Sequence, residues 1–195
     1  IGKKANLYEK QSKSLGSIDE FLQQSPKVDM IKRGAYAWEP IINNMPSERT
    51  LVTIDGMRIF GACTDKMDPI TSYVEVSNLE EATITSGQEG ACFGNTIGGS
   101  IDLKRNKNTF GEKMWDFALN SGFETNNKQK ILGASVNYRD SLFYVDSDVM
   151  LRNAENYKAG NSKEVLFSQF SKTNFSNTFG FRLSDNKSLE TAIIY

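Results

Sequence analysis

The second half of the chain alternates apolar and polar positions over long stretches. Polar or charged side chains such as Asn120, Asp146 and Arg182 stand between large apolar ones. The apolar set is Trp115, Phe117, Leu119, Phe123, Leu132, Ala134, Val136, Tyr138, Phe143, Val145, Val149, Leu151, Phe175, Phe179, Phe181 and Leu183. A period of two residues is typical of β-strands that have one apolar and one polar face. We therefore predict successive antiparallel strands that begin near Trp115, Lys130, Leu142, Phe175 and Leu189.

The same alternation occurs in two kinds of β-sheet protein. A soluble β-sandwich buries the apolar face of each sheet against a second sheet, whereas a transmembrane barrel turns that face towards lipid. The joins between the predicted strands are uneven, because 125–128 and 184–188 are short while 152–162 is long and polar. Barrels commonly alternate short and long joins, but periodicity alone leaves both architectures open.

The first half of the chain predicts a mixed structure of short elements. A helix is expected at 18–22, where Ser17 can cap the first turn, Glu20 completes a capping box, and an apolar stripe follows. A β-hairpin is expected at 51–60, because two β-prone runs flank Asp55-Gly56, a pair that accepts the positive φ angles of a type I′ turn. Further strands are predicted at 28–33 and 101–103, and a short turn that leads into a strand is predicted at 79–87.

The sequence changes character in the polar stretch at 104–112. We divide the chain there into two domains, residues 1–105 and residues 106–195. The short basic run Lys104, Arg105 and Lys107 falls at this division, and we expect it to be a solvated connection.

Composition removes several classes of function. The net charge of −1 argues against nucleic acid as a partner, because phosphate binding depends on clustered Lys and Arg. The chain has no His, so neither a Ser-His-Asp site nor a His-containing zinc site can be built from it. The paired acids Glu80-Glu81 and Asp146/Asp148 are interpreted as turn charges and as inward-facing polar residues. With no catalytic constellation, we do not expect an enzyme.

No apolar run approaches about 18 residues, so no membrane-spanning helix is expected.

Four stretches of the first half resemble, in their order, the plug domain of TonB-dependent outer-membrane receptors. They are the helix Ser17–Leu22, the pair Arg33-Gly34, the hairpin Val52–Ile59, and the Gly-rich closing segment Gly90–Gly94 with Ile97–Leu103. This ordered set, followed by barrel-like alternation, decides between sandwich and barrel. The predicted fold class is an α+β plug domain at 1–105 followed by antiparallel strands of an incomplete transmembrane β-barrel at 106–195.

The resemblance implies a function and a set of partners. Such a plug sits inside a barrel of about 22 strands, in the bacterial outer membrane, with the plug facing the periplasm. The implied activity is import of a scarce ligand, a small molecule or metal ion, driven by the TonB energy-transducing protein. The remaining implied partners are outer-membrane lipid and the rest of the chain's own barrel.

A candidate metal site lies after the predicted hairpin. Cys63 and Met67 would supply a thiolate and a thioether, soft ligands that favour Cu(I) over Mg, Ca or Fe(III). The stretch from Gly61 to Tyr73 also resembles the plug loop of TonB-dependent copper receptors. That resemblance implies that Cys63 and Met67 bind copper, the transported ligand, with further ligands from the barrel.

Several alternatives stay open at this point. Cys63 could be a small buried apolar residue or be bridged to Cys92, and Met67 could serve only in packing. The transported ligand could instead be a siderophore, an oligosaccharide or a peptide. A third possibility is a β-rich binding module that transports nothing.

Overall fold

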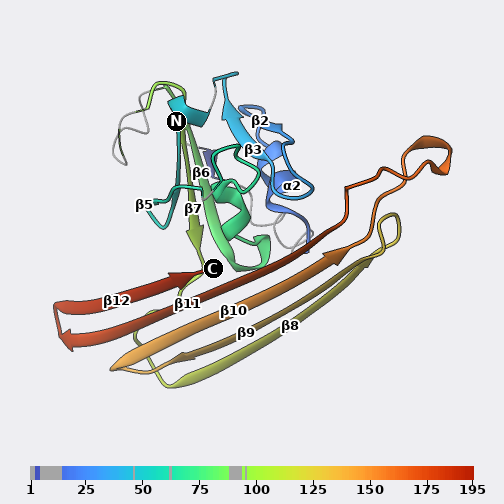
Figure 1. Cartoon of the computed structure of the whole chain (residues 1–195). Helices are drawn as coiled ribbons and strands as arrows, with labels where there is room; N and C mark the ends of the chain where they lie inside the picture. The colour runs from blue at the N-terminus through green and yellow to red at the C-terminus, as the bar shows by residue number, and fades with distance from the viewer. Residues whose placement is uncertain (1–2, 5–14, 46, 62, 88–93, 95) are drawn as a thin grey trace. The chain divides into compact units, whose positions relative to one another are not determined.

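The computed structural model describes residues 3–4, 15–45, 47–61, 63–87, 94 and 96–195. The chain divides into two compact units, Ile1–Asn106 and Lys107–Tyr195 (Figure 1). The Gly-rich segment at 88–93, which contains Cys92, lies outside the described residues. Among the described residues, no helix has the length and apolar character needed to cross a membrane.

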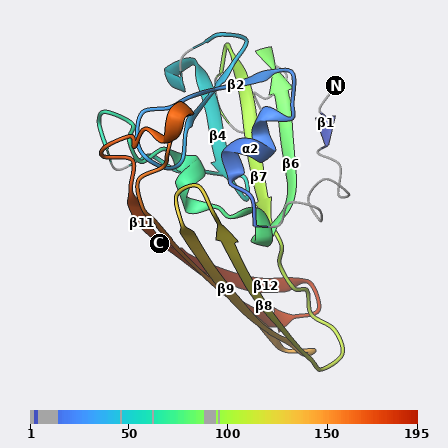
Figure 2. The same ribbon diagram turned by 90° about the vertical axis from the view of Figure 1, so that its right-hand side faces the viewer.

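The first unit is built on a five-stranded sheet with the order β1-β6-β7-β4-β5. Figure 2 shows β4, β7 and β6 side by side. The only parallel pair in this sheet is β4 with β7, and the others are antiparallel. Its strands are β1 (Lys3–Lys4), β4 (Thr50–Ile54), β5 (Met57–Arg58), β6 (Leu79–Ser86) and β7 (Gly99–Arg105). The remaining elements are helix α2 (Ile18–Gln23), the paired strands β2 (Val28–Ile31) and β3 (Glu39–Ile42), and the 3-10 helices η1 (Ser47–Arg49), η2 (Ile70–Tyr73) and η3 (Val76–Asn78).

Helix α2 forms where the sequence predicts it. The Oγ atom of Ser17 accepts a hydrogen bond from the backbone N–H of Glu20 at 3.2 Å, as expected of an N-cap. The side chains of Ile18, Phe21 and Leu22 are all buried, because they share the face that packs into the core.

The predicted hairpin is also present, although its second arm is short. Thr53 pairs with Arg58, and Ile54 pairs with Met57. Asp55 and Gly56, between them, have φ angles of 53° and 75°. Two successive positive φ angles define the type I′ turn that the Asp-Gly pair predicts.

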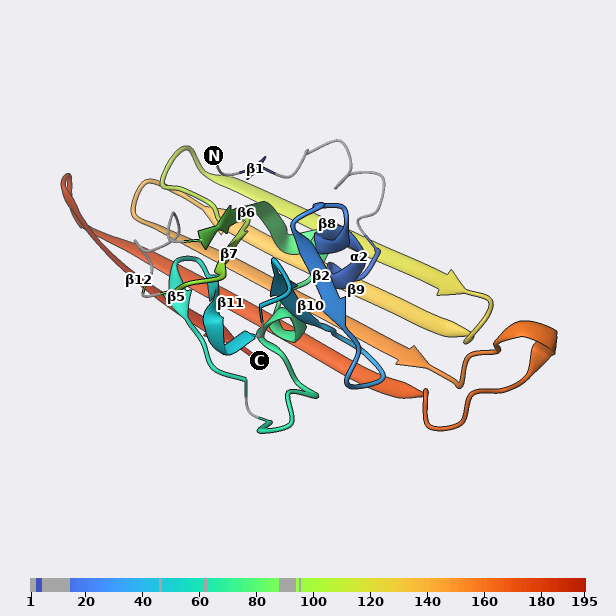
Figure 3. The same ribbon diagram turned by 90° about the horizontal axis from the view of Figure 1, so that it is seen from above.

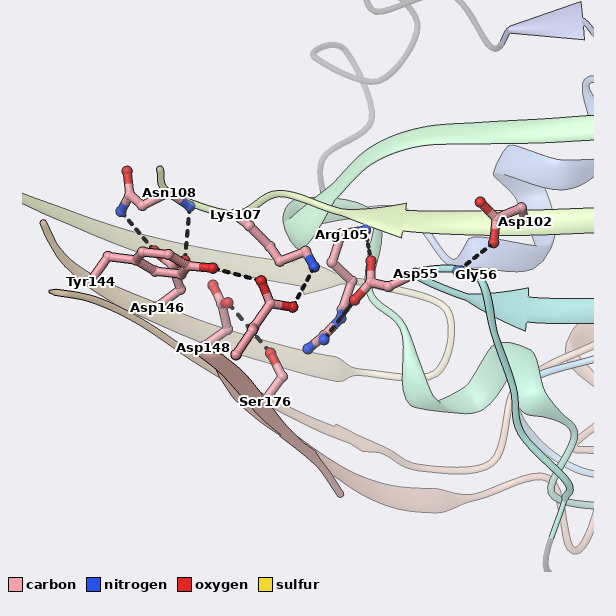
Figure 4. A network of polar contacts seen from close by, with 11 residues as sticks. Asp55, Gly56, Asp102, Arg105, Lys107, Asn108, Tyr144, Asp146, Asp148 and Ser176 are labelled. Atoms are coloured by element: carbon pink, nitrogen blue, oxygen red, sulfur yellow. Dashed lines mark hydrogen bonds and ion pairs between the residues drawn. The ribbon is translucent and has the colours of Figure 1, made fainter. Parts of the chain in front are cut away.

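The basic run at the end of β7 differs from the solvated connection expected from the sequence. The backbone N–H of Arg105 donates to Asp55 Oδ1 at 2.8 Å, and its Nε and Nη2 atoms lie 2.9 and 2.7 Å from Asp55 Oδ2 (Figure 4). Both side chains are buried, with 3% and 4% exposure. Lys104, by contrast, is exposed and pairs with Glu80. The turn residue Asp55 therefore fixes the end of β7 as well as the hairpin.

The second unit is one antiparallel sheet in which each strand pairs with its neighbours in sequence. Figure 3 shows β8 to β11 running side by side. This confirms the predicted strand order. The strands are β8 (Met114–Glu124), β9 (Gln129–Arg139), β10 (Phe143–Ala154), β11 (Phe170–Ser184) and β12 (Lys187–Ile194), and the 3-10 helix η5 (Gly160–Ser162) lies in the long link between β10 and β11.

The strand register places the predicted apolar set on a single face. Trp115 lies opposite Tyr138, Tyr138 opposite Val145, and Val145 opposite Phe179. Most large side chains of this face are exposed, up to 77% for Leu119. The predicted polar set lies on the other face, where the least exposed side chains include Asp146, Asn174, Ser176 and Thr178. An exposed apolar face and a buried polar face are the reverse of a water-soluble sheet and match a barrel wall.

The polar face holds the segment that leads into β8. The backbone N–H and Nδ2 of Asn108 donate to the carboxylate of Asp146 at 2.8 and 2.7 Å (Figure 4). Lys107 Nζ and the Tyr144 hydroxyl donate to the two oxygens of Glu190 at 2.8 and 2.6 Å. The start of this unit is therefore fixed to the polar side of β10 and β12 by charged hydrogen bonds.

A charge on the apolar face should destabilise the barrel. Leu119→Arg places a cation on the exposed apolar face of β8, and the expected cost is about 2–4 kcal/mol near the bilayer midplane. Ala118→Arg, one residue away on the polar face, should cost less. The measurement is the free energy of unfolding of the full-length protein in lipid vesicles. Equal costs for the two variants would contradict the assignment of the faces.

Removing Arg105 should loosen β7. Arg105→Met leaves the buried Asp55 carboxylate without its cation, which costs about 3–5 kcal/mol for a buried pair. The control is Lys104→Met, because this substitution removes the same charge from an exposed pair and should cost less than about 1 kcal/mol. Hydrogen exchange of the β7 amides in the full-length protein measures both. Equal exchange in the two variants would show that the buried pair contributes little.

Candidate functional site

The loop between β5 and η2 contains both candidate metal ligands, and its two ends meet closely. A Cβ atom built on Gly61 would lie 2.7 Å from the carbonyl oxygen of Asp68, so this approach requires glycine. The carboxylate of Asp68 accepts hydrogen bonds from the Ser72 and Tyr73 hydroxyls at 2.6 and 2.8 Å. These contacts attach the end of the loop to η2.

Cys63 and Met67 flank a single turn of this loop. The backbone N–H of Lys66 donates to the carbonyl oxygen of Cys63 at 3.0 Å, which closes the turn. Cys63 is a half-buried free thiol, and Met67 is 49% exposed. The backbone of Met67 lies against Gly34, where an added Cβ would be 3.1 Å from the Met67 carbonyl oxygen. Cys63 thus begins the turn and Met67 follows directly after it. The alternative partner of Cys63, Cys92, lies outside the described residues.

Cys63 lines an open cavity of about 410 Å³. One part of the lining is apolar, and it consists of Pro40, Leu51, Val52, Ile59, Phe60, Pro69 and Ile70. The other part carries charge, from Glu39, Glu48, Arg58, Lys66 and Asp68. The Cys63 thiol therefore lies beside a cavity with both apolar and charged walls.

The side chain of Lys66 is half-buried and reaches β3 and η1 of the plug. Its Nζ atom lies 2.6 Å from Ser47 Oγ and 3.0 Å from Glu39 Oε1, and it also pairs with Glu48. The Glu39 side chain is 3% exposed, and its other carboxylate oxygen accepts a charged hydrogen bond from Arg33 Nε at 2.5 Å. One buried carboxylate therefore joins the strand pair β2–β3 to the Cys63–Met67 turn.

The electrostatics of this network favour its charged form. Burial opposes ionisation of Glu39, but hydrogen bonds from Ser47, Arg33 and Lys66 outweigh it and hold the pKa of Glu39 below its ordinary value. Burial likewise opposes the charge on Lys66, yet Glu48 and Glu39 raise the pKa of Lys66 above its ordinary value. Both groups are therefore ionised at neutral pH.

The donor set fits a soft metal ion better than a hard one. Within the part of the chain that the structure describes, no group of three or more His, Cys, Asp or Glu side chains could hold a metal ion. A metal on this loop would therefore depend on the Cys63 thiolate and the Met67 thioether, completed by groups from elsewhere in the receptor.

Comparison with known proteins identifies the family. Residues 5–100 match the model described as "TonB-dependent Receptor Plug Domain". The chain therefore belongs to the TonB-dependent receptors, and it comprises their plug domain and a run of barrel strands. The predicted fold class is thereby confirmed. No curated protein matches the sequence.

Solved receptors share the fold over nearly the whole chain. The copper transporter OprC is 20% identical with a TM-score of 0.86, covering 98% of this chain and 30% of its own. The siderophore receptor PirA from Acinetobacter baumannii is 14% identical with a TM-score of 0.74, covering 99% and 31%. The FrpB iron transporter from Neisseria meningitidis (F3-3 variant) is 17% identical with a TM-score of 0.72, covering 91% and 28%. The chain thus spans about a third of the length of these receptors, and the likeness concerns the fold.

The Glu39 network predicts an acid-dependent stability. Because the folded-state pKa of Glu39 is lowered, its ionised form stabilises the fold above the ordinary pKa of 4.5, and this is lost as pH falls through the folded-state value. Glu39→Gln should therefore be less stable than wild type at pH 7 by about 2 kcal/mol. The difference should shrink below pH 4.5.

Urea unfolding of the plug in the full-length protein measures this difference, followed at several pH values by Trp38 fluorescence after all other tryptophans, including Trp115, have been replaced by Phe. The control is Glu80→Gln, which alters an exposed ion pair and should change little at any pH. A wild-type advantage that stays constant from pH 7 to pH 3 would contradict the assignment to Glu39.

Proposed function

We propose that this chain is part of a TonB-dependent receptor that imports copper across the bacterial outer membrane. The observation that carries the proposal is a turn of the plug that begins at Cys63, is closed at Lys66, and is followed directly by Met67. One structurally similar receptor is named a copper transporter, but at 20% identity that likeness supports only the fold. The choice of ligand therefore rests on these side chains.

The location follows from the second unit. Its sheet exposes an apolar face, which suits contact with lipid, and keeps its polar side chains on the opposite face. A barrel wall of this kind belongs in the outer membrane, with the plug closing the lumen and facing the periplasm. The rest of the barrel would complete the wall, since an open sheet edge is not tolerated in hydrocarbon.

The ligand chemistry favours Cu(I). A thiolate and a thioether are soft donors and select a soft ion over Fe(III), Mg or Ca. The exposed position of Met67 and the half-buried position of Cys63 leave room for barrel ligands to complete the coordination. Copper is then the transported substrate and is held only until the plug rearranges.

The plug is suited to local opening. Its described elements are short, with strands of two to eight residues, one six-residue helix and several 3-10 helices joined by loops. Such segments open at lower free energy than a continuous sheet. TonB, the energy-transducing partner, would supply the free energy that rearranges the plug, while the closed barrel stays intact.

A siderophore is the second candidate ligand. The cavity beside Cys63 has a volume of about 410 Å³ and combines apolar walls with charged side chains of both signs, which is typical of a site for a small organic ligand. Two of the similar structures are named a siderophore receptor and an iron transporter. Under this alternative Cys63 would line the site without binding metal.

Substitution of the sulfur residues separates the two candidates. Cys63→Ala should lower copper affinity by more than about 100-fold, since loss of a residue that only orients a ligand already costs roughly 10–100-fold. Met67→Ala should lower it less, because a neutral thioether is a weaker ligand than a thiolate. Met57→Ala is the matched control, since Met57 is a plug methionine with similar exposure, 47% against 49%. Acid should weaken binding in the wild type, because protons compete for the thiolate.

The measurement is copper content and Cu(I) affinity of the purified full-length receptor under reducing, copper-replete conditions. Copper in the wild type and in Met57→Ala, with loss in Cys63→Ala, would support copper import. Equal copper content in all variants, or no copper in the wild type, would contradict the proposal of copper import. Binding of a ferric siderophore by a wild type without copper would favour the second candidate.

A further inference from the structure

We propose that Lys66 is a positioning residue, which holds Cys63 and Met67 in place through its ion pair with the buried Glu39. This inference rests on the proposed function, because it concerns the same turn of the plug. Lys66 binds no ligand itself. Its backbone closes the turn that begins at Cys63 and directly precedes Met67, while its half-buried side chain pairs with the buried Glu39.

The contacts of Lys66 reach two separate elements. Glu39, 3.0 Å from its Nζ atom, belongs to β3, and Ser47 and Glu48 belong to η1. Its own N–H donates to Cys63, and the next residue along the chain is Met67. Among the described contacts, no other residue of the turn both closes the turn with its backbone and binds another element with its side chain. A shift of Lys66 would therefore move both sulfur residues relative to the core.

The Lys66–Glu39 ion pair differs from a surface salt bridge because Glu39 is buried. The Glu39 side chain is 3% exposed, whereas both partners of the exposed pair Lys104–Glu80 are about half exposed, at 49% and 47%. A desolvated carboxylate that loses one of its cations is strongly destabilised. An exposed pair contributes little to position or stability.

The backbone of Lys66 gives an independent reason for the pair. Its φ angle is 56°, in the left-handed region that favours glycine. A residue with a Cβ atom is strained in that conformation. Because Lys66 occupies it, the contacts of its side chain have to offset the strain. The turn at Cys63 is therefore held in a conformation that the local sequence alone would not maintain.

Two close approaches limit the turn from outside. Gly61 lies against Asp68, and Gly34 lies against Met67. Arg33, the neighbour of Gly34, binds the same Glu39 carboxylate as Lys66. The positions of Cys63 and Met67 are consequently restricted before any ligand binds, both by the Lys66–Glu39 pair and by the two close approaches. Preorganised ligands bind more tightly, because less freedom is lost on binding.

The first test does not involve copper. A nitroxide is attached to Cys63 in the full-length receptor from which all other cysteines, including Cys92, are removed, and its mobility is measured by electron paramagnetic resonance. Lys66→Met should mobilise the label, whereas Lys66→Arg should restore most of the immobilisation because it keeps a cation. Lys104→Met, the matched control, should leave the spectrum unchanged. An unchanged spectrum in Lys66→Met would overturn the inference.

The second test measures Cu(I) affinity with the native thiol present. Lys66→Met should bind Cu(I) about 10–100-fold more weakly than wild type, as expected when a residue that orients metal ligands is lost. Lys66→Arg should recover much of this loss, and Lys104→Met should match wild type. If the wild type binds copper and Lys66→Met binds it equally well, Lys66 has no positioning role and the proposed function stands. If the wild type binds no copper while the label is mobilised, copper import fails and the fixing of Cys63 by Lys66 is supported.

Discussion

Every backbone polar group of a strand in hydrocarbon has to be paired, and this constraint governs the second unit. Its strands are long and antiparallel, each pairs with its neighbours in sequence, and the register keeps one face apolar from β8 to β12. The polar groups that such a wall needs are placed on the other face, where Asp146 and Glu190 bind the segment that leads into β8. The same constraint does not act on the plug, whose elements are short and mixed.

The plug depends instead on a few buried charged contacts at its turns. Asp55 closes the hairpin and holds the end of β7 through Arg105, and Glu39 holds the turn after the hairpin through Lys66. Buried ion pairs add little net stability compared with apolar packing, but breaking one is costly. They therefore specify where each turn lies. A domain held in this way keeps a defined closed arrangement and can still open in segments.

The sequence predicts those features whose signal is local. A period of two residues reveals the strands of the second unit, Ser17 with Glu20 marks the start of α2, and Asp55-Gly56 marks the hairpin turn. The ion pairs Asp55–Arg105 and Glu39–Lys66 could not be predicted, because the partners of each pair lie far apart in the sequence. A basic run such as Lys104-Arg105 looks solvated wherever it occurs, and only the tertiary fold shows that Arg105 is buried and Lys104 is exposed. Lys66 likewise reads as an ordinary loop residue until its contact with Glu39 is known.

At the candidate site, too, the sequence indicates the chemistry of the ligands, whereas only the fold shows where their side chains are held. Cys63 and Met67 indicate which kind of metal ion could bind, because their sulfur atoms are soft ligands whatever the fold. The fold does not choose the ligand, since similar structures are named copper, siderophore and iron proteins. Differences in ligand must then come from residues outside the shared framework, such as those of the plug loops and the residues that fix these loops. Under the proposed function, the residue that fixes Cys63 and Met67 lies between them, and the five-residue segment Cys63 to Met67 would then set both the type of ligand and its geometry.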